Sequence, residues 1–358
     1  MSQATTALTL PPPADPQAPR ILVVRVSALG DIVFASSLLD GLRRRWPRAR
    51  IHWLAQAGLA GILREDPRVD EVITLTPQTL KSPAALWRLR RQLRARRYDY
   101  VLEAQGLFKS RLLAALAGGT RIGFASKEPG SFLIHHLLPK GGEIRDISSE
   151  YRYLAQRLTG EYAGPPRLQP SAAQRDSVQA RARALGLAGG FIAFCPFTTR
   201  PQKHWFESRW AELAGALAQQ GETRPIALFG GPGDAEAAAR ILAAAAVPIV
   251  NLVGQTKVAE LPAWLAQAQL VIGVDTGLTH IGIAVQTPTV ALFGSTCPYL
   301  QLGSAGEEAR LRVLYEALPC SPCRRSPTCE GRYDCMRQLT VDRVTSAAAG
   351  LLRAAPGR

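Results

Sequence analysis

The stretch with the clearest capacity for chemistry runs from Val271 to His280, with the sequence Val-Ile-Gly-Val-Asp-Thr-Gly-Leu-Thr-His. Its apolar start predicts a buried strand that breaks at 275–277, and its end predicts a helix. A helix that begins directly after a strand leaves backbone N–H groups and partial positive charge at its N-terminus, which suits a phosphate. The alternative is an ordinary helix N-cap by Asp275 or Thr276, with His280 as a bystander.

A second candidate phosphate site follows the predicted strand 191–194. The segment Thr198-Thr-Arg-Pro-Gln-Lys203 places two hydroxyls and two cations within six residues. Such a set suits a diphosphate, although a surface loop would have the same composition. Gly230-Gly-Pro-Gly-Asp234 is a further glycine-rich turn after a strand, but it lacks the G-x-G-x-x-G register, and the chain has no Walker-type P-loop motif. The sequence therefore favours neither a dinucleotide fingerprint nor a Walker-type NTPase.

The candidate general base lies near the N-terminus. Residues 21–26 form a short β-branched run, Ser27-Ala-Leu-Gly30 forms a small-residue turn, and Asp31 opens a helix with an apolar face. This pattern predicts a carboxylate at the carboxyl edge of a parallel sheet, where open α/β sheets bind ligands. There it could accept a proton from a substrate hydroxyl. The alternative is that Asp31 only caps its helix.

Four of the six cysteines lie within sixteen residues, in the pattern Cys320-x2-Cys323-x5-Cys329-x5-Cys335. In a chain without an export signal, disulfides are disfavoured, and four clustered thiolates suit a tetrahedral metal. The pattern therefore predicts a structural Zn or Fe site, with reduced thiols or a redox disulfide as alternatives. No open coordination position is implied, so this metal is not assigned to catalysis. Cys195 and Cys297 are isolated and are expected to be core residues.

Predicted strands and helices alternate along most of the chain, which is typical of βαβ units and parallel sheets. The pattern occurs twice, around the Pro- and Gly-rich segment 164–170, and predicts two doubly wound α/β domains with a cleft between their carboxyl edges. We expect the strand at 289–293 to close the second sheet. The predicted divisions are a disordered leader at 1–19, an N-terminal domain at 20–170, a C-terminal domain at 171–340 that includes the cysteine segment, and a terminal helix at 341–358. One possible arrangement is that this terminal helix packs back onto the N-terminal domain.

The positive charge of the chain is concentrated in its N-terminal half. Residues 1–185 carry 28 Lys and Arg against 15 Asp and Glu, whereas residues 186–358 carry 15 against 13. This distribution predicts an acidic partner, although solvated arginine faces would explain part of it. Aromatic residues interleaved with basic ones are scarce and no nucleic-acid motif occurs, so we expect no nucleic-acid partner. The first eighteen residues lack an apolar signal core, which predicts a cytoplasmic protein.

Four segments in register resemble glycosyltransferase family 9, the ADP-heptose:lipopolysaccharide heptosyltransferases, and most closely the heptosyltransferase I branch. They are residues 26–31, 98–110, 198–205 and 274–280. The resemblance implies a GT-B fold of two Rossmann-like domains, with the acceptor on the N-terminal domain and the nucleotide sugar on the C-terminal one. It also implies inverting transfer without a catalytic metal or other cofactor. The cysteine segment looks more like that of heptosyltransferase II and of other branches, some of which hold a metal in a cysteine finger.

The resemblance also implies roles for individual residues. Asp31 would act as general base, which typically contributes about 10² to 10⁴ in rate, and Lys203 with the N–H groups at 276–277 would stabilise the departing ADP. The implied donor contacts are Thr199, Arg200, Gly230, Gly231, Asp275, Thr276, Gly277 and His280, and the implied acceptor contacts are Ser27, Gly30, Lys109 and Lys127.

The expected reaction moves L-glycero-D-manno-heptose from ADP-heptose to the Kdo region of lipopolysaccharide. The acceptor would be Kdo-lipid A at the cytoplasmic face of the inner membrane of a Gram-negative bacterium, whose anionic surface the basic half would contact. One alternative is a different donor or acceptor, including a heptosyltransferase II-like acceptor or a protein. A second is a non-catalytic module that binds anionic glycolipid. A sugar-nucleotide epimerase would need paired acid and base residues, and only Asp31 is obvious.

Overall fold

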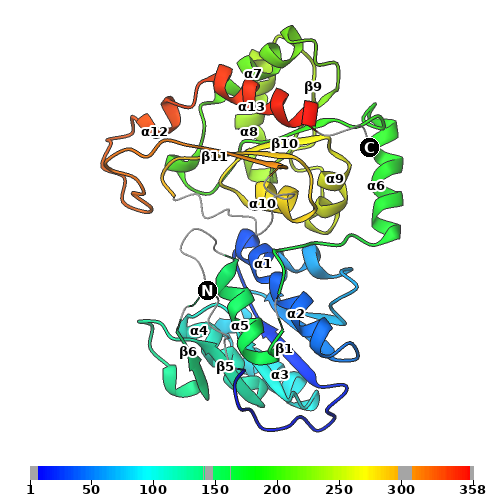
Figure 1. Ribbon diagram of the computed structural model, residues 1–358, viewed down its shortest axis with the longest axis vertical. Helices are drawn as coiled ribbons and strands as arrows, with labels where there is room; N and C mark the ends of the chain where they lie inside the picture. The colour runs from blue at the N-terminus through cyan, green and yellow to red at the C-terminus, as the bar shows by residue number, and fades with distance from the viewer. Residues whose placement is uncertain (1–6, 140, 142–147, 162, 297–308, 355–358) are drawn as a thin grey trace. The chain divides into compact units, whose positions relative to one another are not determined.

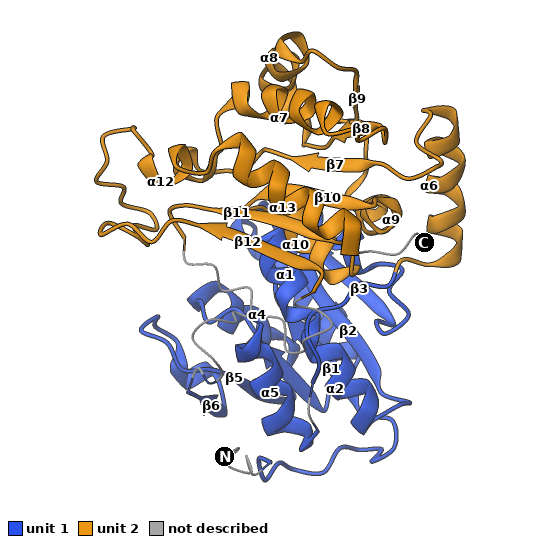
Figure 2. Cartoon of the chain, turned by 45° about the horizontal axis from the view of Figure 1, so that its top comes forward, with its two compact units in different colours: residues 1–169 blue, residues 170–358 orange. Residues whose placement is uncertain are grey.

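The computed structural model describes residues 7–139, 141, 148–161, 163–296 and 309–354 (Figure 1). The chain divides into two compact units, residues 1–169 and residues 170–358 (Figure 2). Each unit is a parallel sheet with helices beside its strands, as βαβ connections require. No helix in the described part of the chain is both long enough and apolar enough to cross a membrane.

In the first unit the described residues form a six-stranded parallel sheet in the order β3-β2-β1-β4-β5-β6. Residues 21–24 of β1 are fully buried, as expected for the apolar runs of parallel strands covered on both faces. The strand order reverses between β1 and β4, so the topological switch point lies between these two strands. The strands are β1 (Arg20–Val24), β2 (Arg50–Gln56), β3 (Glu71–Leu75), β4 (Tyr100–Glu103), β5 (Thr120–Phe124) and β6 (His136–Leu138). The helices are α1 (Leu29–Ala35), α2 (Ser37–Arg45), α3 (Pro83–Ala95), α4 (Phe108–Ala117) and α5 (Ser149–Thr159), with 3₁₀ turns η1 (Ala60–Leu63), η2 (Thr79–Lys81) and η3 (Ser131–Leu133).

The second unit repeats this architecture. Its described strands form a six-stranded parallel sheet in the order β12-β11-β10-β7-β8-β9, and the order reverses between β7 and β10. The strands are β7 (Ile192–Cys195), β8 (Ile226–Leu228), β9 (Ile249–Asn251), β10 (Leu270–Val274), β11 (Thr289–Phe293) and β12 (Leu311–Tyr315). The helices are α6 (Ala172–Ala184), α7 (Glu207–Gln219), α8 (Ala235–Ala244), α9 (Leu261–Gln267), α10 (Gly277–Ala284), α12 (Asp334–Arg337) and α13 (Val341–Ala354), with 3₁₀ turns η4 (Pro201–Lys203), η5 (Pro232–Asp234) and η6 (Val258–Glu260). The prediction of two doubly wound parallel sheets is confirmed.

The second sheet extends one strand further than the sequence suggested. Strand β11 was expected to close the sheet, but β12 pairs with it in parallel, residue 289 opposite residue 311. Most of β12 is only partly buried, and it includes Arg312. A short, partly exposed edge strand with a charged residue has a weak sequence pattern, which explains why this strand was not predicted.

The N-terminal leader also differs from its prediction. Residues 1–6 lie outside the described residues, but the part from residue 7 onward contacts the first unit instead of being disordered. The amide of Leu8 donates to the carbonyl of Arg157 (2.7 Å), and the hydroxyl of Tyr100 donates to the carbonyl of Pro11 (2.9 Å). A proline-rich segment has few N–H groups to satisfy, so a small number of such contacts is enough to position it.

The terminal helix α13 packs against α7 and against strands β10, β11 and β12 of its own unit. Its apolar face, formed by Val344, Ala348 and Leu351, belongs to the hydrophobic core of the second unit. The apolar face of this helix is therefore covered by its own unit. The amphipathic pattern identified which face of the helix is buried, but the pattern contains no information about which sheet covers that face.

Candidate functional site

Three loops meet at the carboxyl edge of the second sheet. They follow β7, β10 and β11, which are neighbours in the sheet. The hydroxyl of Thr198, after β7, donates to the carbonyl of Asp275, after β10 (3.3 Å). The hydroxyl of Thr296, after β11, donates to the carboxylate of Asp275 (2.6 Å). The loops therefore converge at the topological switch point, where open α/β sheets bind ligands.

The side chain of Asp275 is the centre of this cluster and is 12% exposed. One carboxylate oxygen lies 2.5 Å from the Nζ of Lys203, and the other lies 3.1 Å from the Nε2 of His280. Burial alone would raise the pKa of Asp275, but the hydrogen bond and charge of His280, followed by those of Lys203, outweigh it and hold that pKa well below its usual range. Asp275 is therefore an ionised anchor that holds the Lys203 ammonium at the sheet edge.

Helix α10 begins at Gly277, immediately beside this cluster. Its N-cap residue, Thr276, makes no side-chain hydrogen bond to the first turn of the helix. Asp275 instead directs its carboxylate to Lys203, His280 and Thr296, so the interpretation of this acid as a helix cap is wrong. The helix N-terminus and the Lys203 ammonium add two sources of positive charge at one place, an arrangement that suits a phosphate group.

Two glycines allow α10 to lie directly on β10. A Cβ added to Gly273 would lie 2.2 Å from the Oγ1 of Thr279, and a Cβ added to Gly282 would lie 2.9 Å from a methyl carbon of Val271. Thr279 is fully buried and donates to the carbonyl of Val274 (2.6 Å). This close packing fixes the helix N-terminus relative to the end of the strand.

The other predicted donor residues lie in the loops on either side. Gly230 follows β8, the strand next to β7, and a Cβ there would lie 2.5 Å from the Phe197 ring. The amide of Gly231 donates to the carboxylate of Asp234 (2.8 Å). Thr199 is exposed and Arg200 is half-buried, both in the loop that carries Lys203. The structure thus places all the predicted donor residues along the carboxyl edge of the second sheet. The ion-paired cluster around Asp275 lies at the end of β10.

In the first unit, Asp31 lies in the first turn of α1, beside the switch point between β1 and β4. Its carboxylate is 2.7 Å from the Nη2 of Arg25 and accepts a hydrogen bond from the amide of Ala28 (3.2 Å). The capping role that the sequence left open is therefore present. The Asp31 side chain is nevertheless 35% exposed, so the carboxylate is accessible to a substrate hydroxyl.

Arg25 contacts the candidate base Asp31 and was not identified from the sequence. It is buried, and its Nη1 donates to the carbonyl of Ala104, which directly follows β4 (2.9 Å). Burial would lower the pKa of Arg25, but the neighbouring Tyr151 and Asp31 outweigh this effect and raise it, so the guanidinium stays charged. The feature of the sequence that could have identified Arg25 is a single arginine that follows an apolar strand. Thr296 was not identified from the sequence either, and the corresponding feature is its place in the small-residue turn after β11.

The predicted acceptor residues occupy three neighbouring loops of the first unit. Ser27 and Gly30 are half-buried in the turn that leads to Asp31. Lys109 is exposed in the first turn of α4, which follows β4, and Lys127 is exposed in the loop after β5. All four therefore lie toward the carboxyl edge of the sheet, the edge that also carries Asp31.

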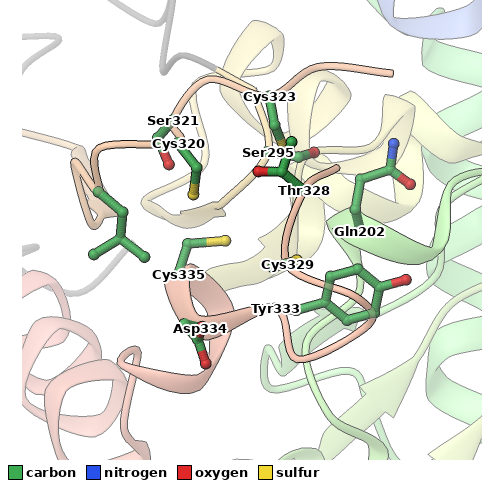
Figure 3. A pocket seen from close by; sticks show the side chains of 11 residues that line it. Gln202, Ser295, Cys320, Ser321, Cys323, Thr328, Cys329, Tyr333, Asp334 and Cys335 are labelled. Carbon is green, nitrogen blue, oxygen red and sulfur yellow. The ribbon is translucent and has the colours of Figure 1, made fainter. Parts of the chain in front are cut away.

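The four clustered cysteines line one small pocket with Ser295 and Tyr333, as Figure 3 shows. The pocket adjoins the Lys203 loop, because the side-chain amide of Gln202 lines it and donates to the carbonyl of Arg324 (2.9 Å). Cys320 is exposed, Cys335 is buried, and all four thiols are free of disulfides. The sequence therefore identified the cluster correctly as one spatial group.

The metal predicted at this cluster is not supported by the described residues. Among them, no three His, Cys, Asp or Glu side chains are arranged to hold a metal ion. Burial raises the pKa of the Cys323 and Cys335 thiols, so without a metal these thiols are protonated. Close spacing in sequence brings thiols together but does not orient their lone pairs. Cys195 is fully buried, as predicted, and Cys297 lies outside the described residues.

The pKa of Asp275 leads to a prediction about stability. A carboxyl group whose pKa is lowered in the folded state contributes stability above its ordinary pKa of 3.8, and this contribution is lost as the pH falls below that value. We expect wild type to be more stable than Asp275→Asn at about pH 5, and this difference to shrink as the pH falls below about 4. Urea unfolding of both proteins across this pH range measures it. A difference that does not change with pH would show that the carboxylate is not ion-paired in solution.

Two doubly wound units, with a phosphate-suited cluster at the switch point of the second, define a class of fold: the chain has the GT-B fold. The comparisons with known proteins give the particular family. The family model for glycosyltransferase family 9 (heptosyltransferase) matches residues 86–334, and the chain belongs to this family. Lys203 and Asp275 lie within the matched residues, whereas Asp31 precedes them.

Similar proteins span nearly the whole chain. Lipopolysaccharide heptosyltransferase 1 of Pseudomonas aeruginosa is 29% identical, and the alignment covers 94% of this chain and 98% of that protein. Lipopolysaccharide heptosyltransferase 2 of Escherichia coli is also 29% identical, covering 93% and 98%. Among solved structures, the ADP-heptose lps heptosyltransferase II of E. coli superposes with a TM-score of 0.75 at 26% identity, covering 93% of this chain and 98% of that one.

Proposed function

We propose that this enzyme transfers L-glycero-D-manno-heptose from ADP-heptose to the Kdo of the lipopolysaccharide inner core. Membership in family 9 supports heptosyl transfer, and the names of the relatives support a lipopolysaccharide acceptor. A solved E. coli relative, heptosyltransferase WaaC, which is 26% identical with a TM-score of 0.69 over 92% of this chain and 99% of that one, contains ADP-2-deoxy-2-fluoro heptose. The observation that carries the proposal is the Lys203–Asp275 ion pair beside the N-terminus of α10.

The donor diphosphate is assigned to this ion pair and helix terminus. Asp275 fixes the position of the Lys203 ammonium, and Thr296 and His280 fix the position of Asp275. The cation is thus held in place before the substrate arrives, so little reorganisation is needed when negative charge develops on the leaving group. Thr199, Arg200, Gly230 and Gly231 complete the proposed donor site in the adjoining loops.

Asp31 is assigned as the general base for the acceptor hydroxyl. In the proposed step, the acceptor oxygen forms a bond to C1 of the heptose while the bond from C1 to the β-phosphate oxygen of ADP breaks. The hydroxyl proton passes to the carboxylate of Asp31. Charge on the departing ADP is stabilised by Lys203 and by the N–H groups at 276–277. Attack on the face opposite the leaving group inverts C1 and uses no metal ion.

The acceptor is assigned to the first unit. Ser27 and Gly30 adjoin Asp31, and Lys109 and Lys127 offer exposed ammonium groups for phosphates of a Kdo-lipid A acceptor. The excess of basic residues in residues 1–185 supports an anionic acceptor and work at the cytoplasmic face of the inner membrane.

A heptosyltransferase II-like acceptor is the second candidate. Relatives named lipopolysaccharide heptosyltransferase 1 are 28% to 30% identical to this chain and those named lipopolysaccharide heptosyltransferase 2 are 29% identical, so percentage identity favours neither acceptor. Four segments of the sequence resemble heptosyltransferase I, whereas the cysteine segment departs from it. The acceptor is therefore tested directly.

The deciding experiment gives the purified enzyme ADP-heptose with either Kdo₂-lipid A or its monoheptosylated form, and product mass is read by mass spectrometry. We expect one heptose to be added to Kdo₂-lipid A. Addition to the monoheptosylated form alone would establish the heptosyltransferase II-like reaction instead. Parallel reactions with UDP- and GDP-sugars test the donor, and product from one of these alone would overturn the assignment of ADP-heptose.

A further inference from the structure

Three exposed apolar side chains gather at one edge of the first unit. Among the described residues, the large hydrophobic side chains with substantial exposure are Trp87, Phe108, Phe132, Leu137 and Leu185. Three of these five lie between residues 108 and 137. Phe132 is the most exposed at 82%, a high value for a phenylalanine in a folded segment.

These three side chains belong to adjoining elements. Helix α4, which starts with Phe108, packs against η3, which contains Phe132. A Cβ added to Gly130, the residue before η3, would lie 2.8 Å from the Phe108 ring. Strand β6 follows η3 directly and forms the edge of the sheet beside β5, and Figures 1 and 2 both show α4, β5 and β6 close together. We call Phe108, Phe132 and Leu137 the apolar edge.

A buried arginine holds the segment that presents this edge. Arg111 of α4 is fully buried, and its guanidinium donates to the carbonyls of Glu128 (2.6 Å), Pro129 (2.8 Å) and Phe124 (3.1 Å). These bonds fix the chain that leads into η3. The exposure of Phe132 is therefore imposed by an anchored loop.

Exposed positive charge lies next to the apolar edge. Lys109 follows Phe108 in α4, and Lys127 lies in the loop that Arg111 holds, where Glu128 is an exposed acidic residue. Apolar side chains flanked by lysines match an anionic bilayer surface, because the apolar groups enter the acyl boundary while the ammonium groups remain among the headgroups. A protein partner fits less well, since lysine is depleted from the centres of protein–protein interfaces.

We propose that the apolar edge, flanked by Lys109 and Lys127, docks the first unit onto an anionic lipid bilayer. This inference rests on the proposed function, because an acceptor anchored by lipid A must be reached at a membrane surface. It extends that function by naming the side chains that enter the bilayer. Lys109 and Lys127 would then contact both headgroups and acceptor phosphates, which would present the acceptor sugar to the edge of the sheet that carries Asp31.

The test is flotation of the purified enzyme with vesicles of phosphatidylglycerol and phosphatidylcholine, compared with vesicles of phosphatidylcholine alone. The chain offers a matched pair of leucines, Leu137 at 40% exposure in the first unit and Leu185 at 39% in the second. We expect Phe132→Ser to lower partitioning into anionic vesicles about tenfold, and Leu137→Ser to lower it severalfold, since a buried apolar side chain contributes free energy of this order. Leu185→Ser is expected to partition like wild type. Circular dichroism confirms that each variant is folded.

The results separate this inference from the proposed function. Transfer to a water-soluble, deacylated acceptor is expected to be the same for wild type and Phe132→Ser, whereas transfer to acceptor embedded in vesicles falls with Phe132→Ser. Absence of transfer to every acceptor would refute the proposed function, but vesicle flotation would still measure docking. Any of three results would overturn the docking proposal. They are equal partitioning of Leu137→Ser and Leu185→Ser, equal binding to neutral and anionic vesicles, and a change in oligomeric state in place of vesicle binding.

Discussion

Asp31→Asn is expected to lower kcat by about 10² to 10⁴ while leaving the affinity for the nucleotide sugar unchanged. The amide keeps the size and part of the hydrogen bonding of the carboxylate, but it cannot accept the proton from the attacking hydroxyl. Initial rates of ADP release with saturating acceptor measure the effect on kcat. Isothermal titration with ADP measures nucleotide binding, which we assign to the other unit.

The first unit provides a matched control for this variant. Asp70, like Asp31, is partly exposed and lies 2.7 Å from an arginine, in its case Arg43. It immediately precedes β3, at the amino edge of the sheet, away from the proposed acceptor site. We expect Asp70→Asn to keep full activity. Comparable losses in the two variants would mean that breaking any aspartate–arginine pair in this unit disturbs the fold, and full activity of Asp31→Asn would refute its role as base. A non-catalytic glycolipid-binding module would respond to neither change.

Lys203→Met is expected to lower kcat by about 10² to 10³, because it removes the cation assigned to the charge that develops on ADP. The methionine side chain retains most of the apolar length of lysine but has no charge. We also expect weaker binding of ADP, since the diphosphate is already anionic before transfer. Steady-state kinetics and ADP titration measure these two effects separately.

A double-mutant cycle with Asp275→Asn identifies the role of the ion pair. If Asp275 acts by positioning Lys203, then the loss from Asp275→Asn should largely vanish in the background of Lys203→Met, because contacting residues in one network are not additive. Fully additive losses would mean that Asp275 contacts the substrate on its own. Arg240→Met is the control, because it removes an exposed cation that is paired with Glu207 elsewhere in the same unit. We expect it to leave both kcat and the affinity for ADP unchanged.

The proposed donor site shows how much of a site could be predicted from local sequence. The chemistry of 198–203 and of 275–280 was visible because each segment directly follows an apolar strand, and parallel strands end at the same edge of a sheet. Thr296 was missed because its contact with Asp275 depends on β11 lying beside β10, and strand order is set by packing over the whole sheet. The same reason applies to Arg25, which directly follows β1 and donates to the carbonyl of Ala104 because β4 lies beside β1.

The cysteine cluster shows what sequence spacing alone leaves undecided. Four thiols within sixteen residues did come to line one pocket, but they are not arranged as metal ligands in the described structure. Tetrahedral coordination needs the sulfurs to converge on one point, and that depends on the backbone path between them. Here Cys335 is carried by α12 in the core of the second unit, while the other three lie in the preceding loop.

The amino-acid sequence by itself determined the two parallel sheets, the strand ends that carry the polar residues and the concentration of basic charge in the first half, because apolar periodicity and composition are local properties. Only the tertiary structure decided that Asp275 holds Lys203 instead of capping α10, that Arg25 is paired with Asp31, and that α13 packs within the second unit. Lys203 and Asp275 are far apart in the chain, as are α13 and the strands it covers, and Arg25, although close to Asp31 in sequence, is also held by the distant Ala104. Their partners are selected by strand order and by the shape of the core, which no short stretch of sequence specifies.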